Sequence, residues 1–129
     1  MCKANFQILT NNPLVAEKYP QVTQVVPGSV YDVFVAGRDR IHRGCRLINH
    51  PLAGSVKPNE SPYKTLLLSL DRATLDFYSL QLIEGAFQTL RKLPEKHIPY
   101  PPAMRADYQV IDLDLVDSAI LALPAAYHF

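Results

Sequence analysis

The feature that most constrains this chain is the segment 49–64, Asn-His-Pro-Leu-Ala-Gly-Ser-Val-Lys-Pro-Asn-Glu-Ser-Pro-Tyr-Lys. Its prolines, glycine and asparagines disfavour both a helix and a strand. A connection of this length within a compact domain is uncommon, and such loops are usually either functional or disordered. Apolar residues precede the segment at 46–48 and follow it at 65–68, where strands would hold both of its ends. We therefore interpret segment 49–64 as an ordered functional loop.

Short apolar runs bounded by Pro, Gly and Asn predict five strands along the chain. We expect them at Phe6–Leu9, Gln24–Val26, Arg46–Ile48, Tyr63–Leu70 and Tyr108–Ile111. Capping residues followed by apolar residues at helical spacing predict four helices. We expect these over residues 13–18, 30–43 and 76–93, capped by Asn12, by Ser29 and by either Asp71 or Asp76, and from Asp112 or Asp114 to Leu123.

Strands that alternate with helices imply an α/β fold around a mostly parallel sheet. The 129 residues suffice for one hydrophobic core, so we expect a single α/β domain over residues 1–129. We predict a three-layer sandwich, in which a mostly parallel sheet of about five strands carries helices on both faces. The connection between strands 46–48 and 63–70 contains no helix, so an antiparallel direction for strand 63–70 is also open.

Ligands in open α/β sheets bind outside the carboxyl ends of the strands. The first two predicted strands end in polar residues, and the third enters the loop directly. We therefore expect three separate segments to form one ligand-binding site. Its candidate residues are Thr10, Asn11, Asn12, Gly28, Ser29, Asn49, His50, Gly54, Ser55, Lys57, Asn59 and Lys64.

The side chains of the loop permit two interpretations of the site. His50 could exchange a proton or donate to an anion, Lys57 and Lys64 could bind a carboxylate or phosphate, and Glu60 could move a proton. Alternatively, His50 bonds to the loop backbone, the charged side chains form a solvated surface set, and Asn12 only caps a helix. No catalytic residue is assigned, although His50 and Glu60 are the candidates for acid–base chemistry.

Other classes of site have little support in the sequence. Gly54-Ser55 does not complete the Gly-x-Ser-x-Gly pattern of serine hydrolases, and no phosphate-binding glycine motif is present. Cys2 and Cys45 lack the spacing of a metal site, so we expect no metal and no cofactor. Cys45 could be a reactive thiolate beside an arginine, but a buried cysteine at a strand start is the commoner situation.

The charge of the chain also limits its partners. A net charge of +1 provides no long-range field for nucleic acid or an anionic membrane. We interpret one basic cluster as a solvated helix end, so we expect no nucleic-acid partner; its members are Arg38, Arg40, His42, Arg43 and Arg46. Apolar runs are too short for a membrane span. Few cysteines and no evident signal peptide predict a cytoplasmic protein, and a homo-oligomer stays open.

Two stretches of the chain resemble the GrdX family, small proteins encoded beside glycine reductase genes in amino-acid-fermenting anaerobes. These are Thr10–Val15 and His50–Lys64, and Val110–Asp112 also matches within a similarity from about Ile8 to Asp117. The resemblance implies an accessory role near the selenoprotein-containing glycine reductase system, whose components are then possible partners. It implies no activity, because the family has no assigned reaction and no catalytic residues to transfer.

We carry two hypotheses of function forward from the sequence. The first is a non-catalytic accessory or binding protein, whose loop 49–64 recognises a small anionic ligand or a partner surface. The second is a small enzyme that uses His50 and Glu60 as acid and base while Lys57 holds a carboxylate or phosphate.

Overall fold

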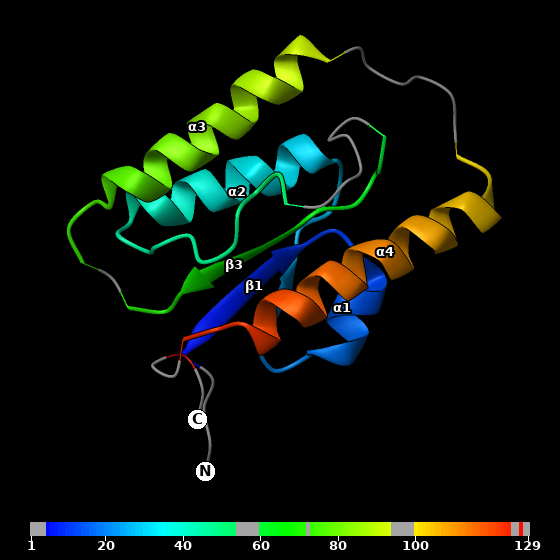
Figure 1. The fold of residues 1–129 in the computed structure, drawn as a ribbon, viewed down its shortest axis with the longest axis horizontal. Coiled ribbons are helices and arrows are strands. Elements are labelled where there is room, and N and C mark those ends of the chain that lie inside the picture. Colours follow the sequence, from blue (N-terminus) through cyan, green and yellow to red (C-terminus); the bar gives the residue numbers. More distant parts are fainter. Residues whose placement is uncertain (1–4, 54–59, 72, 94–99, 125–126, 128–129) are drawn as a thin grey trace.

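The computed structural model describes residues 5–53, 60–71, 73–93, 100–124 and 127 (Figure 1). Its strands are β1 (Phe6–Thr10), β2 (Thr23–Val25) and β3 (Thr65–Ser69). Its helices are α1 (Pro13–Lys18), α2 (Val30–His42), α3 (Phe77–Lys92) and α4 (Pro102–Leu121).

The three strands form one mixed sheet with the order β2-β1-β3. β1 pairs with β2 in parallel and with β3 antiparallel. The fold is therefore only loosely α/β, and the predicted sandwich with a mostly parallel sheet of about five strands is wrong. The antiparallel direction left open for segment 63–70 is the one that β3 adopts.

The predicted strand 46–48 is reduced to a single antiparallel bridge between Leu47 and Leu68. Further bonds continue this pairing: Ser69 N–H donates to the Arg46 carbonyl at 2.8 Å, and Ile48 N–H donates to the Leu67 carbonyl at 2.8 Å. Beyond Ile48 a side chain replaces the backbone as the partner of β3: the Asn49 amide oxygen accepts from Leu67 N–H, and its amide nitrogen donates to the Thr65 carbonyl. Segment 46–49 is thus too short and irregular for a strand, yet it covers the outer side of β3.

The predicted strand Tyr108–Ile111 is wrong, because these residues lie in the middle of α4. A short apolar run cannot be assigned to a strand or a helix from its periodicity alone. The helix starts instead at Pro102, and proline suits a first helical position because it lacks the N–H that would have no partner there. Asp112 was expected to precede a helix as a cap, but it lies inside α4 and is buried.

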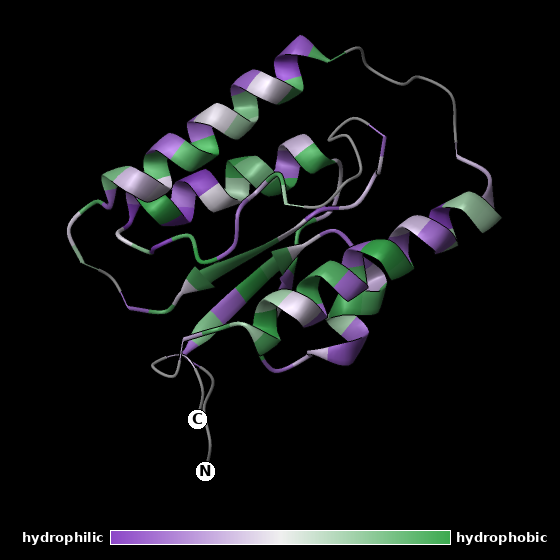
Figure 2. Cartoon of the chain, viewed as in Figure 1, coloured by the Kyte–Doolittle hydropathy of each residue, from purple (hydrophilic) through white to green (hydrophobic). Residues whose placement is uncertain are grey.

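Helices cover both faces of the sheet, with α2 and α3 on one face and α1 and α4 on the other (Figure 1). Side chains alternate along a strand, so Leu66 and Leu68 face α2 and α3, whereas Leu67 faces Val116 of α4. Thr10 and Thr65 pair across β1 and β3. β3 is coloured mainly as hydrophobic in Figure 2, and its five residues are all buried, as expected for a strand covered on both faces.

The first three helices lie close to their predicted bounds because their starts carry clear capping signals. Asn12 accepts from Leu14 N–H at the start of α1, and Ser29 forms a capping box with Asp32 in α2. The residues that helical spacing predicts for the inner face of α2 are all buried, namely Val30, Val33, Phe34, Gly37 and Ile41, and Gly44 after the helix has φ +99°. The spacing predicts an apolar stripe in α3 of Phe77, Leu80, Ile83, Phe87 and Leu90, and it fails only at Phe77, which is 72% exposed.

None of the helices within the described residues combines the length and the apolar character that a bilayer crossing needs.

Candidate functional site

Three segments that are distant in the sequence meet at the carboxyl end of β1, and Asn11 connects them. Its amide nitrogen donates to the Gly28 carbonyl at 3.0 Å and to the Pro62 carbonyl at 2.8 Å. Its amide oxygen accepts from Lys64 N–H at 2.9 Å. The described end of the 49–64 loop therefore lies beside the ends of both β1 and the β2–α2 connection, which is the arrangement that the sequence predicted.

A buried network of polar side chains lies next to this junction and reaches α4. Thr65 Oγ1 donates to Asp112 Oδ2 at 2.7 Å, and Asn12 Nδ2 donates to the same oxygen at 3.0 Å. Thr10 Oγ1 lies 2.7 Å from Thr65 Oγ1 and accepts from Asn12 N–H. Both threonines, Asn12 and Asp112 are each at most 6% exposed. Such a network is costly unless its members are bonded, and these members bond to one another.

A small pocket opens beside the network, with a cavity volume of about 40 Å³. One water needs about 10–15 Å³ on this measure, so the pocket has room for about three water-sized groups. It lies between the start of the 49–64 loop, the residues that enter β3 and one side of α4. The residues that line it are Asn49, His50, Pro51, Ala53, Lys64, Thr65, Asp112, Leu115, Val116 and Ala119.

Burial shifts the two charged groups of the pocket in opposite directions. Loss of solvent raises the pKa of the Asp112 carboxyl above its ordinary value, although bonds from Asn12 and Thr65 and the charge of Lys64 counteract this. Loss of solvent also lowers the pKa of the Lys64 ammonium, and Asp112 counteracts that shift. Among the described residues no carboxylate lies within 4 Å of the Lys64 nitrogen. Its charge is therefore only partly compensated.

His50 lines the pocket with one ring nitrogen already bonded to the backbone. Nδ1 accepts from Leu52 N–H at 3.1 Å, so the neutral ring carries its proton on Nε2. In this tautomer the imidazole presents a donor to its surroundings, and its basic nitrogen is occupied. The alternative interpretation of His50 from the sequence, a bond to the loop backbone, is therefore observed, and His50 is also a pocket-lining residue.

The other predicted site residues divide into structural positions and positions away from the pocket. Gly28 and Ser29 are exposed at the start of α2, where Gly28 has φ +116° and Ser29 caps the helix. Asn49 lines the pocket but bonds to the β3 backbone through both ends of its amide. The Glu60 carbonyl accepts from Tyr100 Oη, and Glu60 is not among the described residues that line the pocket. The remaining candidates, Gly54, Ser55, Lys57 and Asn59, lie outside the described residues.

Asp112 is the charged pocket residue that the sequence did not identify as a candidate. A signal was present, because Asp112 and Asp114 interrupt the apolar run Val110–Val116, and whichever of them is buried needs a polar partner. The position of Asp112 one helical turn before the buried Val116 also fits the inner side of a helix. That pattern was missed because the last helix was expected to start only at Asp112 or Asp114, after a strand over Tyr108–Ile111.

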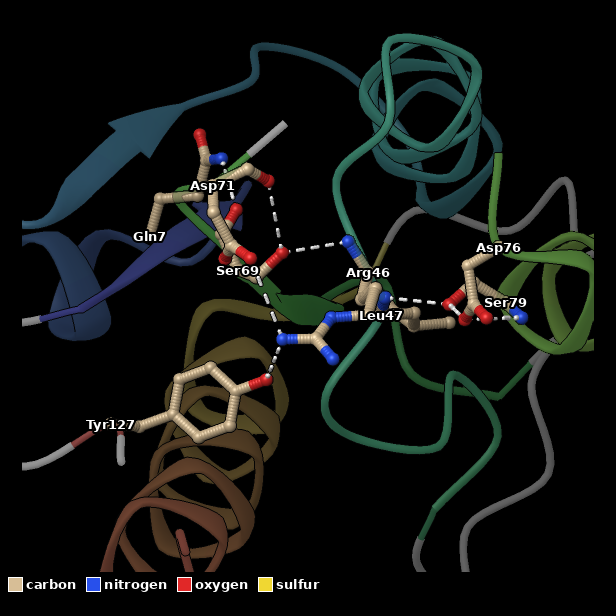
Figure 3. A network of polar contacts seen from close by, with 8 residues as sticks. All are labelled: Gln7, Arg46, Leu47, Ser69, Asp71, Asp76, Ser79 and Tyr127. Atoms are coloured by element: carbon tan, nitrogen blue, oxygen red, sulfur yellow. Dashed lines mark hydrogen bonds and ion pairs between the residues drawn. The ribbon is translucent and has the colours of Figure 1, made fainter. Parts of the chain in front are cut away.

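A second polar network lies at the opposite end of the sheet (Figure 3). Ser69 Oγ accepts from Arg46 N–H at 2.8 Å, and Ser79 Oγ accepts from Leu47 N–H at 2.9 Å. Asp76 accepts from the Ser79 hydroxyl and N–H at the start of α3. The Arg46 side chain donates to Tyr127 Oη and forms an exposed ion pair with Asp71. These contacts position the chain entering segment 46–49.

Within the described residues no group of three or more His, Cys, Asp or Glu side chains is placed to hold a metal ion. Cys45 is buried as the commoner of its two interpretations predicted, and it accepts a hydrogen bond from Gln7.

Fold and site together define a small protein with helices on both faces of a three-stranded mixed sheet and a charged pocket beside its last helix. The family model described as GrdX-like protein matches residues 7–121, which is nearly the whole chain. The chain therefore belongs to the GrdX-like family, and the resemblance drawn from its sequence is confirmed. Neither the curated proteins nor the solved structures contain a significant match.

Proposed function

We propose that this protein is a non-catalytic accessory or binding protein whose pocket between the 49–64 loop and α4 takes a small anion. The observation that carries the proposal is Lys64, a half-buried ammonium that lines the pocket without a carboxylate within 4 Å among the described residues. A partly desolvated charge attracts an ion of opposite sign more strongly than a charge in water does. The Nε2–H of neutral His50 adds a second donor.

The size of the pocket restricts the ligand class. Room for about three water-sized groups suits a monocarboxylate or an inorganic anion better than a nucleotide. The apolar wall from Leu115, Val116 and Ala119 would contact a short alkyl group. An accessory role beside glycine reductase components follows from what the family resemblance implies. The cytoplasmic location expected from the cysteine content belongs to the same proposal.

The enzyme hypothesis has less support from the geometry. General acid–base chemistry needs both groups within about one water of the reacting atom. The Nδ1 atom of His50 is occupied by Leu52 N–H, and Glu60 is not among the described pocket-lining residues. These two positions favour binding over acid–base catalysis by this pair.

Calorimetric titration with acetate, phosphate and acetyl phosphate tests the binding proposal. We expect at least one of them to bind, and Lys64→Met to weaken that binding about tenfold or more, the loss expected for one charge-assisted bond. Lys92→Met is the matched control, because Lys92 is an exposed lysine of the last turn of α3. Absence of binding for all three anions, or equal losses in both variants, would contradict the proposal.

A further inference from the structure

The charges of the pocket pose a problem for an anion that enters it. Lys64 and Asp112 both line the pocket, and with both ionised their formal charges sum to zero although they form no ion pair within 4 Å. The wall of Leu115, Val116 and Ala119 is apolar. An added anion would then leave one uncompensated negative charge in a poorly solvated space, which is strongly unfavourable. Neutrality is restored if one positive charge enters with the anion.

The hydrogen bonds of Asp112 fix where a proton would reside. Oδ2 accepts from both Thr65 Oγ1 and Asn12 Nδ2, so its lone pairs are used. Among the described residues no donor is directed at Oδ1, and this oxygen is not sealed from solvent. Since Asp112 as a whole is only 6% exposed and lines the pocket, Oδ1 is its pocket-facing atom. A proton on Asp112 would therefore sit on Oδ1 and point into the pocket.

We propose that a small anion enters this pocket together with one proton from solvent, and that Asp112 takes the proton on Oδ1 and donates it in a hydrogen bond to the anion. This inference rests on the proposed function, and it assigns Asp112 and Lys64 complementary tasks. Lys64 supplies the charge that the anion needs, and neutral Asp112 supplies a donor instead of a repelling carboxylate. Burial, which raises the pKa of the Asp112 carboxyl, favours the same proton uptake.

Three titratable side chains face this pocket from the described elements that surround it. They are His50 in the loop start, Lys64 before β3 and Asp112 in α4. The other polar groups packed against the Asp112 carboxyl, from Asn12 and Thr65, do not titrate. Proton uptake by Lys64, whose pKa is lowered by burial, or by His50 must therefore be separated experimentally from uptake by Asp112.

Acetate binding measured by calorimetry between about pH 6 and pH 9 tests the proposal, because acetate itself stays ionised in this range. Repeating each titration in buffers of different ionisation enthalpy gives the number of protons taken up. We expect uptake to approach one proton per acetate above the Asp112 pKa, where affinity falls about tenfold per pH unit.

The Asp112→Asn variant makes the prediction specific. Its amide can keep the oxygen beside Asn12 and Thr65 and present N–H to the pocket, so it imitates protonated Asp112. We expect this variant to bind acetate at least as tightly as the parent at pH 8, with no proton uptake. Asp114→Asn, at an exposed position of the same helix, should retain the parental uptake. His50→Gln should retain the pH slope even if its affinity falls.

The outcomes separate the two proposals. No acetate, phosphate or acetyl phosphate binding at any pH contradicts the proposed function itself. Acetate binding without proton uptake, or with unchanged uptake in Asp112→Asn, overturns the proton-coupled inference and leaves anion binding intact. Loss of acetate binding in Asp112→Asn together with tighter parental binding at high pH also overturns it, because Asp112 would then act as an ionised carboxylate.

Discussion

The two ends of the sheet carry polar networks of similar size but different composition. At the Ser69 end the bonds run from serine hydroxyls to backbone N–H groups, and the Asp71 carboxylate is exposed to solvent. At the Thr65 end, about 13 Å away at about 3.3 Å per strand residue, the carboxyl of Asp112 is buried. The first network completes the backbone pairing of an irregular segment. The second holds a titratable group in a fixed orientation beside a pocket.

The comparison shows which features distinguish a candidate site from structural support. Buried serine and threonine hydroxyls occur at both ends and carry no information about function. A carboxyl and an ammonium whose pKa values are both displaced by burial occur together at the Thr65 end. Groups perturbed in this way cluster at functional sites.

The largest effect on stability is expected for Asn12→Ala, which removes the central member of the Thr65-end network. The change deletes the cap of α1 and removes the Asn12 donor from the Gln109 carbonyl and from the Asp112 carboxyl, which keeps its bond from Thr65. We expect a loss of about 3 kcal/mol in the free energy of unfolding, from the cap and the lost bonds to buried groups together. Urea denaturation followed by circular dichroism measures it. A loss below about 1 kcal/mol in the free energy of unfolding would mean that the Thr65-end network does not contribute more to stability than the Ser69-end network.

A smaller effect is expected for Ser79→Ala at the opposite end. The Leu47 N–H loses its acceptor there, and Asp76 loses its bond to the Ser79 hydroxyl. We expect a loss of about 1–2 kcal/mol in the free energy of unfolding, the cost of one unsatisfied buried donor. The same denaturation experiment applies, and acetate affinity should stay at the parental value. Reduced affinity would show that the two ends are coupled.

The smallest effect is a pH dependence that only the Thr65 end should show. Because the folded pKa of Asp112 is raised above its unfolded value of 3.8, the folded state binds more protons between the two values. Stability contributed by Asp112 is therefore fully present below about pH 4 and is lost as pH rises through the folded pKa. The difference in unfolding free energy between Asp112→Asn and the parent should grow in favour of the variant over that range. The pKa of Asp117 is lowered, but Asp117 is present in both proteins, so its contribution to the difference in unfolding free energy cancels.

If the difference in unfolding free energy between Asp112→Asn and the parent is constant across pH, the prediction is wrong. Asp114→Asn is the control variant in the same series of urea titrations. The control variant should show no comparable pH-dependent gain, because Asp114 is exposed.

The parts of the fold that were predictable from sequence are those specified by local chemistry. Asn12, Ser29 and Asp76 mark helix starts through bonds that each makes within a few residues, and the structure contains all three caps. The sheet was not predictable in the same way. Strand number depends on pairing between distant segments, and the apolar runs 46–48 and 108–111 satisfy local strand preferences without such pairing.

The junction of segments beside the candidate pocket was predictable from the sequence, and the residues that line the pocket were less so. The meeting of the 49–64 loop with the ends of β1 and the β2–α2 connection followed from chain order and strand ends. Asp112 was missed because it reaches the site from α4, 47 residues after Thr65. Its part in the pocket depends on the helix extending back to Pro102, which short-range patterns around Asp112 do not reveal.

Asn49 has a consequence for the behaviour of the protein at high concentration. Its amide, together with Arg46 and Ile48, occupies the backbone groups of Thr65, Leu67 and Ser69 that point away from β1. Backbone N–H and C=O groups that lack partners on a flat apolar edge strand can pair with strands of other molecules, and this pairing starts aggregation. The Pro-rich loop thus starts with a residue that closes the most hydrophobic strand of the protein to intermolecular pairing.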